Sequence, residues 1–158
     1  MWVGYRWGVA PITLPLPDLA ATESLGARIA GLLRLGDAVL LEGPLGAGKS
    51  ALARALLRAL LGDPGLFVPS PTFTLVQSYD APIGPVAHFD LWRLDGPGAV
   101  VELGWDEARE GVVLVEWPDR LGALTPPDAL QITLAYAGAS AGEDAREARL
   151  EGWADRLP

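Results

Sequence analysis

Apolar residues recur along this chain in two patterns, one with helical spacing and one in short continuous runs. Before residue 36 they follow the spacing i, i+4, i+7, i+8, which predicts a helix, and we expect Gly36 to be its C-cap. The run AVLL, residues 38–41, is typical of a strand buried on both faces of a parallel sheet. The predicted helix face consists of Leu25, Ile29, Leu32 and Leu33.

The segment ALARALLRALLG, residues 51–62, predicts a second helix because it consists almost wholly of strong helix formers. The turn sequence GDPG, residues 62–65, ends it. Strands alternating with helices predict a single α/β domain with a mixed, mostly parallel central sheet flanked by helices. We expect helical connections over residues 98–109, and strands over 72–79, 86–89, 112–115, 130–136 and 148–153.

Composition removes several classes of function. The 158 residues contain no cysteine and one histidine, which excludes thiol catalysis and sites built from cysteine or several histidines. The net charge is −8 without a basic cluster, so we do not expect the chain to hold a nucleic acid by itself. No apolar run has the length of a bilayer span and the N-terminus does not resemble a signal peptide, so we expect a cytoplasmic protein without a membrane partner. We expect the aromatic N-terminus, with Trp2, Tyr5 and Trp7, to be a frayed or edge-strand tail.

The sequence GPLGAGKS, residues 43–50, matches the phosphate-binding pattern G-x-x-x-x-G-K-[ST] at every specified position. A predicted buried strand precedes it and a predicted helix follows, as the pattern requires. Glycines let backbone N–H groups turn toward phosphate oxygens, and the helix N-terminus adds partial positive charge. Lys49 would reach the β- and γ-phosphates, and the Ser50 hydroxyl would bind Mg²⁺.

Lys49 is the only lysine in the chain; the other basic residues are all arginines. A compact ammonium suits a phosphate site where a planar guanidinium does not, so this distribution supports a P-loop rather than a simple glycine-rich turn.

A P-loop site also needs an acid at the end of a neighbouring strand. Asp90 in VAHFDLWRL and Glu116 in VVLVEWP stand at such ends, and the spacing alone leaves open which one contacts the metal, or whether either is merely a solvated carboxylate. Thr72 and Thr74 follow a Pro-Ser-Pro turn, where they would offer a hydroxyl to the metal or γ-phosphate, or simply suit a strand.

Four other residues near these motifs have plainer interpretations. We expect His88 to be a packed or surface strand residue rather than a base. Arg93 is more typical of a surface salt bridge than of a phosphate contact. Trp92 and Trp117 are expected in aromatic core packing, with the lining of a pocket as the alternative.

Two rival classes of P-loop protein are disfavoured. A GTPase needs an Asn-Lys-x-Asp motif, and this chain has no asparagine and no lysine besides Lys49. A small-molecule kinase usually carries an arginine-rich lid, whereas the arginines here are scattered. The kinase stays open as an alternative, as does a nucleotide-gated docking module without productive hydrolysis.

Taken together, PLPDLAAT, GPLGAGKS, PSPTFTLV, HFDLWRL and LVEWPDRL resemble the TsaE family in their order and spacing, over residues 14–150. This family is the P-loop ATPase of bacterial tRNA threonylcarbamoyladenosine biosynthesis. The resemblance implies ATP and Mg²⁺ as cofactors and slow ATP hydrolysis that rises with the TsaD–TsaB pair. That pair modifies adenosine 37 of tRNA, so contact with tRNA would be indirect, and we expect a monomer when the chain is free.

The resemblance also implies roles for individual residues. Ser50 and Glu116 would ligate Mg²⁺, and Asp90 would organise the attacking water or the metal's surroundings. Thr72 and Thr74 would lie in a segment that senses the γ-phosphate. The nucleotide would be bordered by Leu19, Leu45, Gly46, Ala47, Gly48, Lys49, Ser50, Ala51, Trp117 and Arg146.

This chain departs from the family pattern at Ser50, where threonine is usual, at Pro44, where an acid is common, and at Trp92, where tyrosine is usual. The first change keeps the hydroxyl. We expect the ATPase domain over residues 14–158, preceded by an N-terminal extension or edge segment over residues 1–13.

Overall fold

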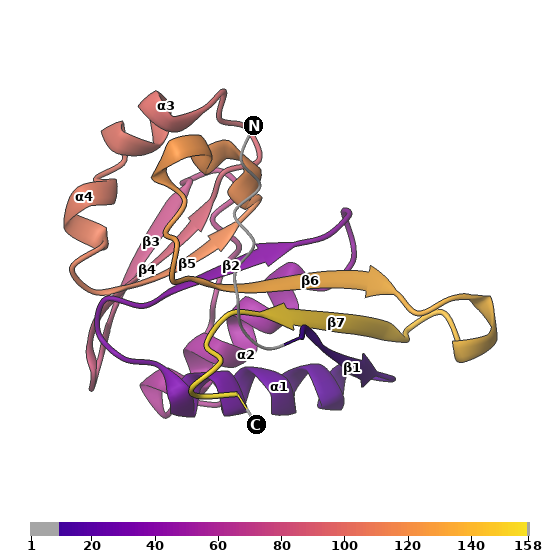
Figure 1. The fold of residues 1–158 in the computed structure, drawn as a ribbon. Coiled ribbons are helices and arrows are strands. Elements are labelled where there is room, and N and C mark those ends of the chain that lie inside the picture. Colours follow the sequence, from indigo (N-terminus) through magenta and orange to yellow (C-terminus); the bar gives the residue numbers. More distant parts are fainter. Residues whose placement is uncertain (1–9, 158) are drawn as a thin grey trace.

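A seven-stranded mixed sheet forms the centre of the molecule (Figure 1). The structure is a computed structural model that describes residues 10–157. The sheet order is β1-β7-β6-β2-β5-β4-β3. The strands are β1 (Ile12–Leu16), β2 (Ala38–Glu42), β3 (Val76–Ala81), β4 (Gly84–Asp90), β5 (Val112–Glu116), β6 (Leu130–Tyr136) and β7 (Arg146–Glu151).

Strands β6, β2, β5 and β4 run parallel at the centre, whereas β3, β7 and β1 add antiparallel edges. In this register Glu116 of β5 pairs with Leu41 of β2 on one side and with Asp90 of β4 on the other. Ligands of open α/β sheets bind beyond the carboxyl ends of such parallel strands. The two predicted acids therefore lie side by side at the carboxyl ends of β4 and β5, where a ligand site is expected.

Helices cover both faces of the sheet (Figure 1). One apolar core joins α1 and α2 to the sheet, and a second core joins it to α3, α4 and η1. The helical elements are α1 (Leu19–Leu32), α2 (Lys49–Leu61), α3 (Pro97–Glu102), α4 (Trp105–Ala108) and the 3₁₀ segments η1 (Pro118–Leu124) and η2 (Ala139–Ala141). This arrangement confirms the predicted α/β fold. Within residues 10–157, no helix is both long and apolar enough to span a bilayer.

Two local predictions were wrong. Gly36 is not the C-cap of α1: the helix ends at Leu32 with Leu33 as its cap, and Gly36 lies in the following turn at φ 89°. Residues 72–75 form a turn rather than the start of a strand, because Leu75 adopts φ 68° and its N–H donates to Pro71 O at 2.7 Å. The strand begins at Val76 instead.

The N-terminal prediction falls partly outside the described residues, since Trp2, Tyr5 and Trp7 are not among them. From Ile12 onward the chain forms β1, which pairs with β7 at one edge of the sheet.

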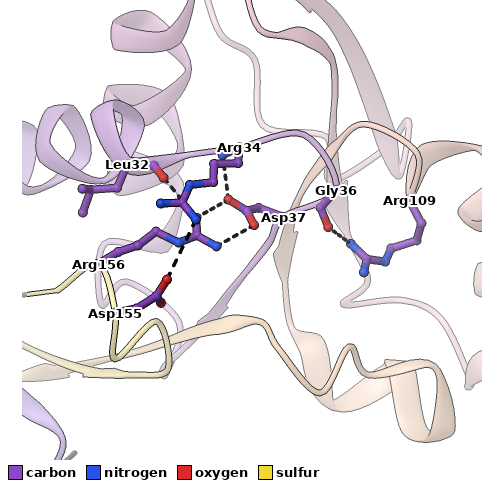
Figure 2. Close-up of polar contacts among 7 residues, drawn as sticks. All are labelled: Leu32, Arg34, Gly36, Asp37, Arg109, Asp155 and Arg156. Atoms are coloured by element: carbon purple, nitrogen blue, oxygen red, sulfur yellow. Dashed lines mark hydrogen bonds and ion pairs between the residues drawn. The ribbon is translucent and has the colours of Figure 1, made fainter.

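An ion-pair cluster joins the C-terminal segment to the turn between α1 and β2 (Figure 2). The Arg156 guanidinium donates through both terminal nitrogens to the Asp37 carboxylate, and it also donates to Leu32 O at 3.0 Å. The hydrogen bond to Asp37 raises the pKa of Arg156. Asp37 further accepts the Arg34 N–H at 2.7 Å.

Candidate functional site

The loop between β2 and α2 has the backbone of a phosphate cradle. Gly46 and Gly48 adopt φ values of 80° and 103°, which only glycine takes without strain. Helix α2 begins at Lys49, directly after Gly48, and no side chain caps its N-terminus. Its first N–H groups are therefore available to an anion, and the helix dipole favours one.

Lys49 folds back over this loop. Its ammonium donates to Gly43 O at 2.7 Å and to Pro44 O at 3.0 Å, and it lies 4.1 Å from the centre of the Trp117 ring. Its exposed fraction is 5%. Burial lowers the pKa of Lys49, and the negative charges of Glu116 and Asp90 offset part of this effect.

Glu116 connects the loop to the sheet. One oxygen, Oε1, accepts the Ser50 hydroxyl at 2.9 Å, and the other, Oε2, lies 2.8 Å from His88 Nε2. The structure thus brings together Ser50 and Glu116, two of the three residues predicted as metal ligands, the third being Asp90. Of the two positions expected for His88, packed or at the surface of a strand, the structure has the packed one, since His88 is 1% exposed.

Asp90 lies at the end of β4 and holds the turn that follows the Pro-Ser-Pro sequence. Its Oδ2 accepts the Thr72 hydroxyl at a long 3.4 Å, its Oδ1 accepts the Trp92 N–H at 3.1 Å, and its own N–H donates to Leu75 O at 2.9 Å. Thr74 is exposed, and its hydroxyl accepts from Gln77 instead. Thr72 therefore reaches the acid, whereas Thr74 points elsewhere.

Arg93 donates to Thr72 O at 3.0 Å and stacks on the exposed ring of Phe73, at 4.8 Å. Its expected surface salt bridge is not among the ion pairs of residues 10–157. Arg93 helps to hold the turn at residues 72–75 instead.

Trp92 and Trp117 pack against each other with ring centres 4.3 Å apart. Because Trp117 also covers Lys49, this pair belongs to the lining of the site and not only to the core.

On the other side of the loop, Arg146 donates to Gly46 O at 3.4 Å and lies over the Tyr136 ring at 4.4 Å. The Tyr136 hydroxyl donates to Leu45 O at 3.0 Å. Arg146 was predicted to border the nucleotide; Tyr136 was not, because nothing in the sequence shows that β6 passes beside the loop.

Leu19 and Ala51 lie together in the lining of a groove of about 470 Å³ between α1 and α2, with Arg54 and Arg58. Leu19 is 60% exposed. Because Ala51 directly follows Ser50, this groove begins at the first turn of α2, next to the phosphate loop.

Sequence reasoning missed the contact between His88 and Glu116. A signal for it exists, because side chains two residues apart on a strand share a face, and His88 precedes Asp90 by two. An acid predicted for the site thus implied that the histidine lies on the same face of the sheet.

The side chains present fit Mg²⁺. Within residues 10–157 no three acidic, histidine or cysteine side chains are grouped to hold a metal by themselves. Mg²⁺ does not need such a cage, since it usually binds one or two carboxylates together with phosphate oxygens and water. Glu116, with Ser50 hydrogen-bonded to it and Asp90 at the paired strand position, supplies oxygen ligands of this kind.

Comparisons with known proteins point to one family. The model of the family described as threonylcarbamoyl adenosine biosynthesis protein TsaE matches residues 16–147. A protein of Rickettsia conorii named tRNA threonylcarbamoyladenosine biosynthesis protein TsaE is 37% identical over 114 residues, 72% of this chain and 65% of the relative. A protein of Bacillus subtilis with the same name is 34% identical over 130 residues, 80% of this chain and 76% of the relative.

The matched region therefore spans slightly under two thirds of the Rickettsia relative and about three quarters of the Bacillus one. Among solved structures, that of YdiB from Bacillus subtilis superposes with a TM-score of 0.75. It is 27% identical in sequence, and the match covers 96% of this chain and 91% of that one.

Proposed function

This chain belongs to the TsaE family, and on that premise we propose that it is a Mg²⁺-dependent ATPase of tRNA threonylcarbamoyladenosine biosynthesis. Its partners would be the TsaD–TsaB pair, and it would meet tRNA only through them. We propose the cytoplasm as its compartment, because a role in tRNA modification fits that location. The observation that carries the proposal is the Lys49–Ser50–Glu116 arrangement on a P-loop.

The chain's own residues account for phosphate binding. The free N–H groups at the start of α2 and the Lys49 ammonium face the same loop, so both favour an anion there. A phosphate oxygen would replace the carbonyls of Gly43 and Pro44 as the partner of Lys49. Because Lys49 already donates to these carbonyls, a nucleotide would compete with them for its N–H groups, which lowers the affinity of the chain alone for the nucleotide.

Ser50 and Glu116 are the residues that would hold Mg²⁺. When bound, the ion would neutralise charge that develops on the phosphates during transfer to water. Asp90 keeps its carboxylate beside this pair and would orient the attacking water. Thr72 contacts Asp90, so movement of the turn at residues 72–75 would change the position of the Asp90 carboxylate.

Hydrolysis of ATP by the purified protein, alone and with a purified TsaD–TsaB pair, tests the proposal. We expect slow release of phosphate that rises several-fold when the pair is added, and no release by a Lys49→Ala variant. Fast turnover alone, or transfer of phosphate to a small molecule, would favour the kinase. Binding of the nucleotide and the pair without any stimulated turnover would favour a docking module.

A further inference from the structure

We propose that His88 is a positioning residue for Glu116: it holds one carboxylate oxygen so that the other is directed to Ser50 and the metal. This inference rests on the proposed Mg²⁺ site and adds to it a residue outside the phosphate loop. His88 itself would contact neither metal nor nucleotide.

The two oxygens of the Glu116 carboxylate have different partners. Oε2 lies 2.8 Å from His88 Nε2, and Oε1 lies 2.9 Å from the Ser50 hydroxyl. Each oxygen has a partner from a different element, β4 on one side and the start of α2 on the other. Without the first contact, the carboxylate would be free to rotate about its terminal bond and turn either oxygen toward Ser50.

The direction of the histidine hydrogen bond follows from the acceptor. An ionised carboxylate only accepts, so the hydrogen must lie on His88 Nε2. His88 Nδ1 is buried and has no hydrogen-bond partner within residues 10–157. The ring therefore makes one polar contact in this part of the chain, and that contact is with Glu116.

Burial argues against a purely structural role. The exposed fractions of His88 and Glu116 are 1% and 2%, and the neighbours of His88 along β4 are alanine and phenylalanine. A histidine with an unpartnered nitrogen packs less favourably there than an aliphatic residue would. The carboxylate is what makes it useful, because a buried Glu116 oxygen would otherwise lack a donor. Residues that support a metal ligand in this way typically change metal affinity 10–100-fold when removed.

The test measures Mg²⁺ dependence apart from activity. Fluorescent ADP would be titrated into wild type, His88→Leu and His88→Gln, first in EDTA and then over a range of Mg²⁺ concentrations. We expect His88→Leu to raise the Mg²⁺ concentration for half-maximal effect about tenfold, with less than about threefold change in affinity in EDTA. Glutamine places an amide N–H near the position of Nε2, so His88→Gln should restore most of the Mg²⁺ response.

Val86→Ala is the matched control. Val86 lies on the same face of β4, is also 1% exposed, and precedes His88 by two residues. We expect it to lower Tm without shifting the Mg²⁺ response. If His88→Leu behaves in the same way, with a lower Tm and an unchanged Mg²⁺ response, His88 only packs the core and the inference is wrong.

Two further outcomes are informative. If His88→Leu does not fold, His88→Asn replaces it. The shorter amide reaches only the position of Nδ1, so the Mg²⁺ response should be weakened. An unchanged response would overturn the inference.

If the wild type binds ADP without any effect of Mg²⁺, the proposed metal site itself fails, and the inference with it. A failure confined to His88 leaves the wild-type Mg²⁺ response intact, so the two are distinguishable.

Discussion

The position of the Lys49 ammonium is set by the phosphate loop itself. It is buried, it donates to two carbonyls of the same loop, and Trp117 covers it. Because a phosphate would take the place of these carbonyls, we expect Lys49→Ala to weaken ADP binding at least tenfold, about 1.4 kcal/mol. Fluorescence titration of ADP measures this. Arg34→Ala removes an exposed positive charge before the start of β2, at the opposite end of that strand from the loop, and should change affinity little; equal losses in both variants would contradict the assignment.

Glu116 allows a second test at this scale. Glu116→Gln keeps an oxygen acceptor for Ser50 but removes the charge that a divalent ion requires. We therefore expect the Mg²⁺ response to weaken about tenfold or more, with a smaller effect on affinity for the nucleotide in EDTA. Glu42→Gln is the control, because Glu42 also ends a parallel strand but accepts from Gln131 at 2.7 Å. A normal Mg²⁺ titration by Glu116→Gln would remove this residue from the metal site.

Single residues were predictable where chemistry restricts their type. The phosphate loop and its lone lysine are visible in the sequence, and two strand-end acids follow from the ends of apolar runs. The partners of these residues were not visible, because contacts such as Ser50 with Glu116 join positions 66 residues apart. They depend on which strands are neighbours, and the hydrophobic pattern does not state that order.

Between elements, α1 and α2 pack closely where they cross at Gly26. A Cβ at Gly26 would lie 2.7 Å from Ala55 Cβ and 2.9 Å from Leu56 N, so Gly26→Ala would push the helices apart. Overpacking of this kind costs about 1–3 kcal/mol, measurable by urea unfolding. Gly31→Ala, in the same helix with nothing within 4 Å of the new Cβ, should be neutral or stabilising. A Gly26→Ala protein as stable as the Gly31→Ala one would show that α1 can shift freely.

Most elements were predictable because their periodicity is strong: α2 and the strands β5 and β6 lie within a few residues of their expected places. The failure at Gly36 has a tertiary cause. Gly36 was assigned to a helix end, but its N–H donates to Gly111 O and its carbonyl accepts from Arg109, both at 2.9 Å. Its conformation is therefore decided by contacts with residues about 75 positions later in the sequence. A rule for helix ends that considers only neighbouring residues does not include such contacts.

The order of the sheet belongs to the whole molecule, and only part of it was predictable. Alternating strands and helices implied parallel pairing at the centre. That β7 returns between β6 and β1, and so brings Arg146 beside the phosphate loop, was not readable from any one segment. The resemblance to the TsaE family predicted that Arg146 lies at the site, whereas the hydrophobic periodicity did not.

The pair of Arg156 with Asp37 attaches the C-terminal segment to the rest of the fold, and it yields a test of global stability. Arg156 and Asp37 have side chains only 13% and 10% exposed, joined by two hydrogen bonds across 119 residues (Figure 2). Among residues 10–157, Arg156→Ala would leave the buried Asp37 carboxylate with only the backbone N–H of Arg34 as partner, so we expect a loss of about 3 kcal/mol. For a chain of this length that corresponds to a fall of roughly 6–12 °C in Tm.

Arg149→Ala is the matched control for this loss. Arg149 pairs with Glu151 at 3.0 Å, but their side chains are 54% and 41% exposed, so its removal should cost less than about 1 kcal/mol. Calorimetric melting of both variants measures the difference. Arg156 binds Asp37 just before the start of β2, whereas the phosphate loop follows the end of that strand, so the Arg156→Ala protein should still bind ADP below its Tm with nearly wild-type affinity. Equal melting temperatures for the two variants would show that the C-terminal segment is not held by this pair, and that the sheet and α1 are stable without it.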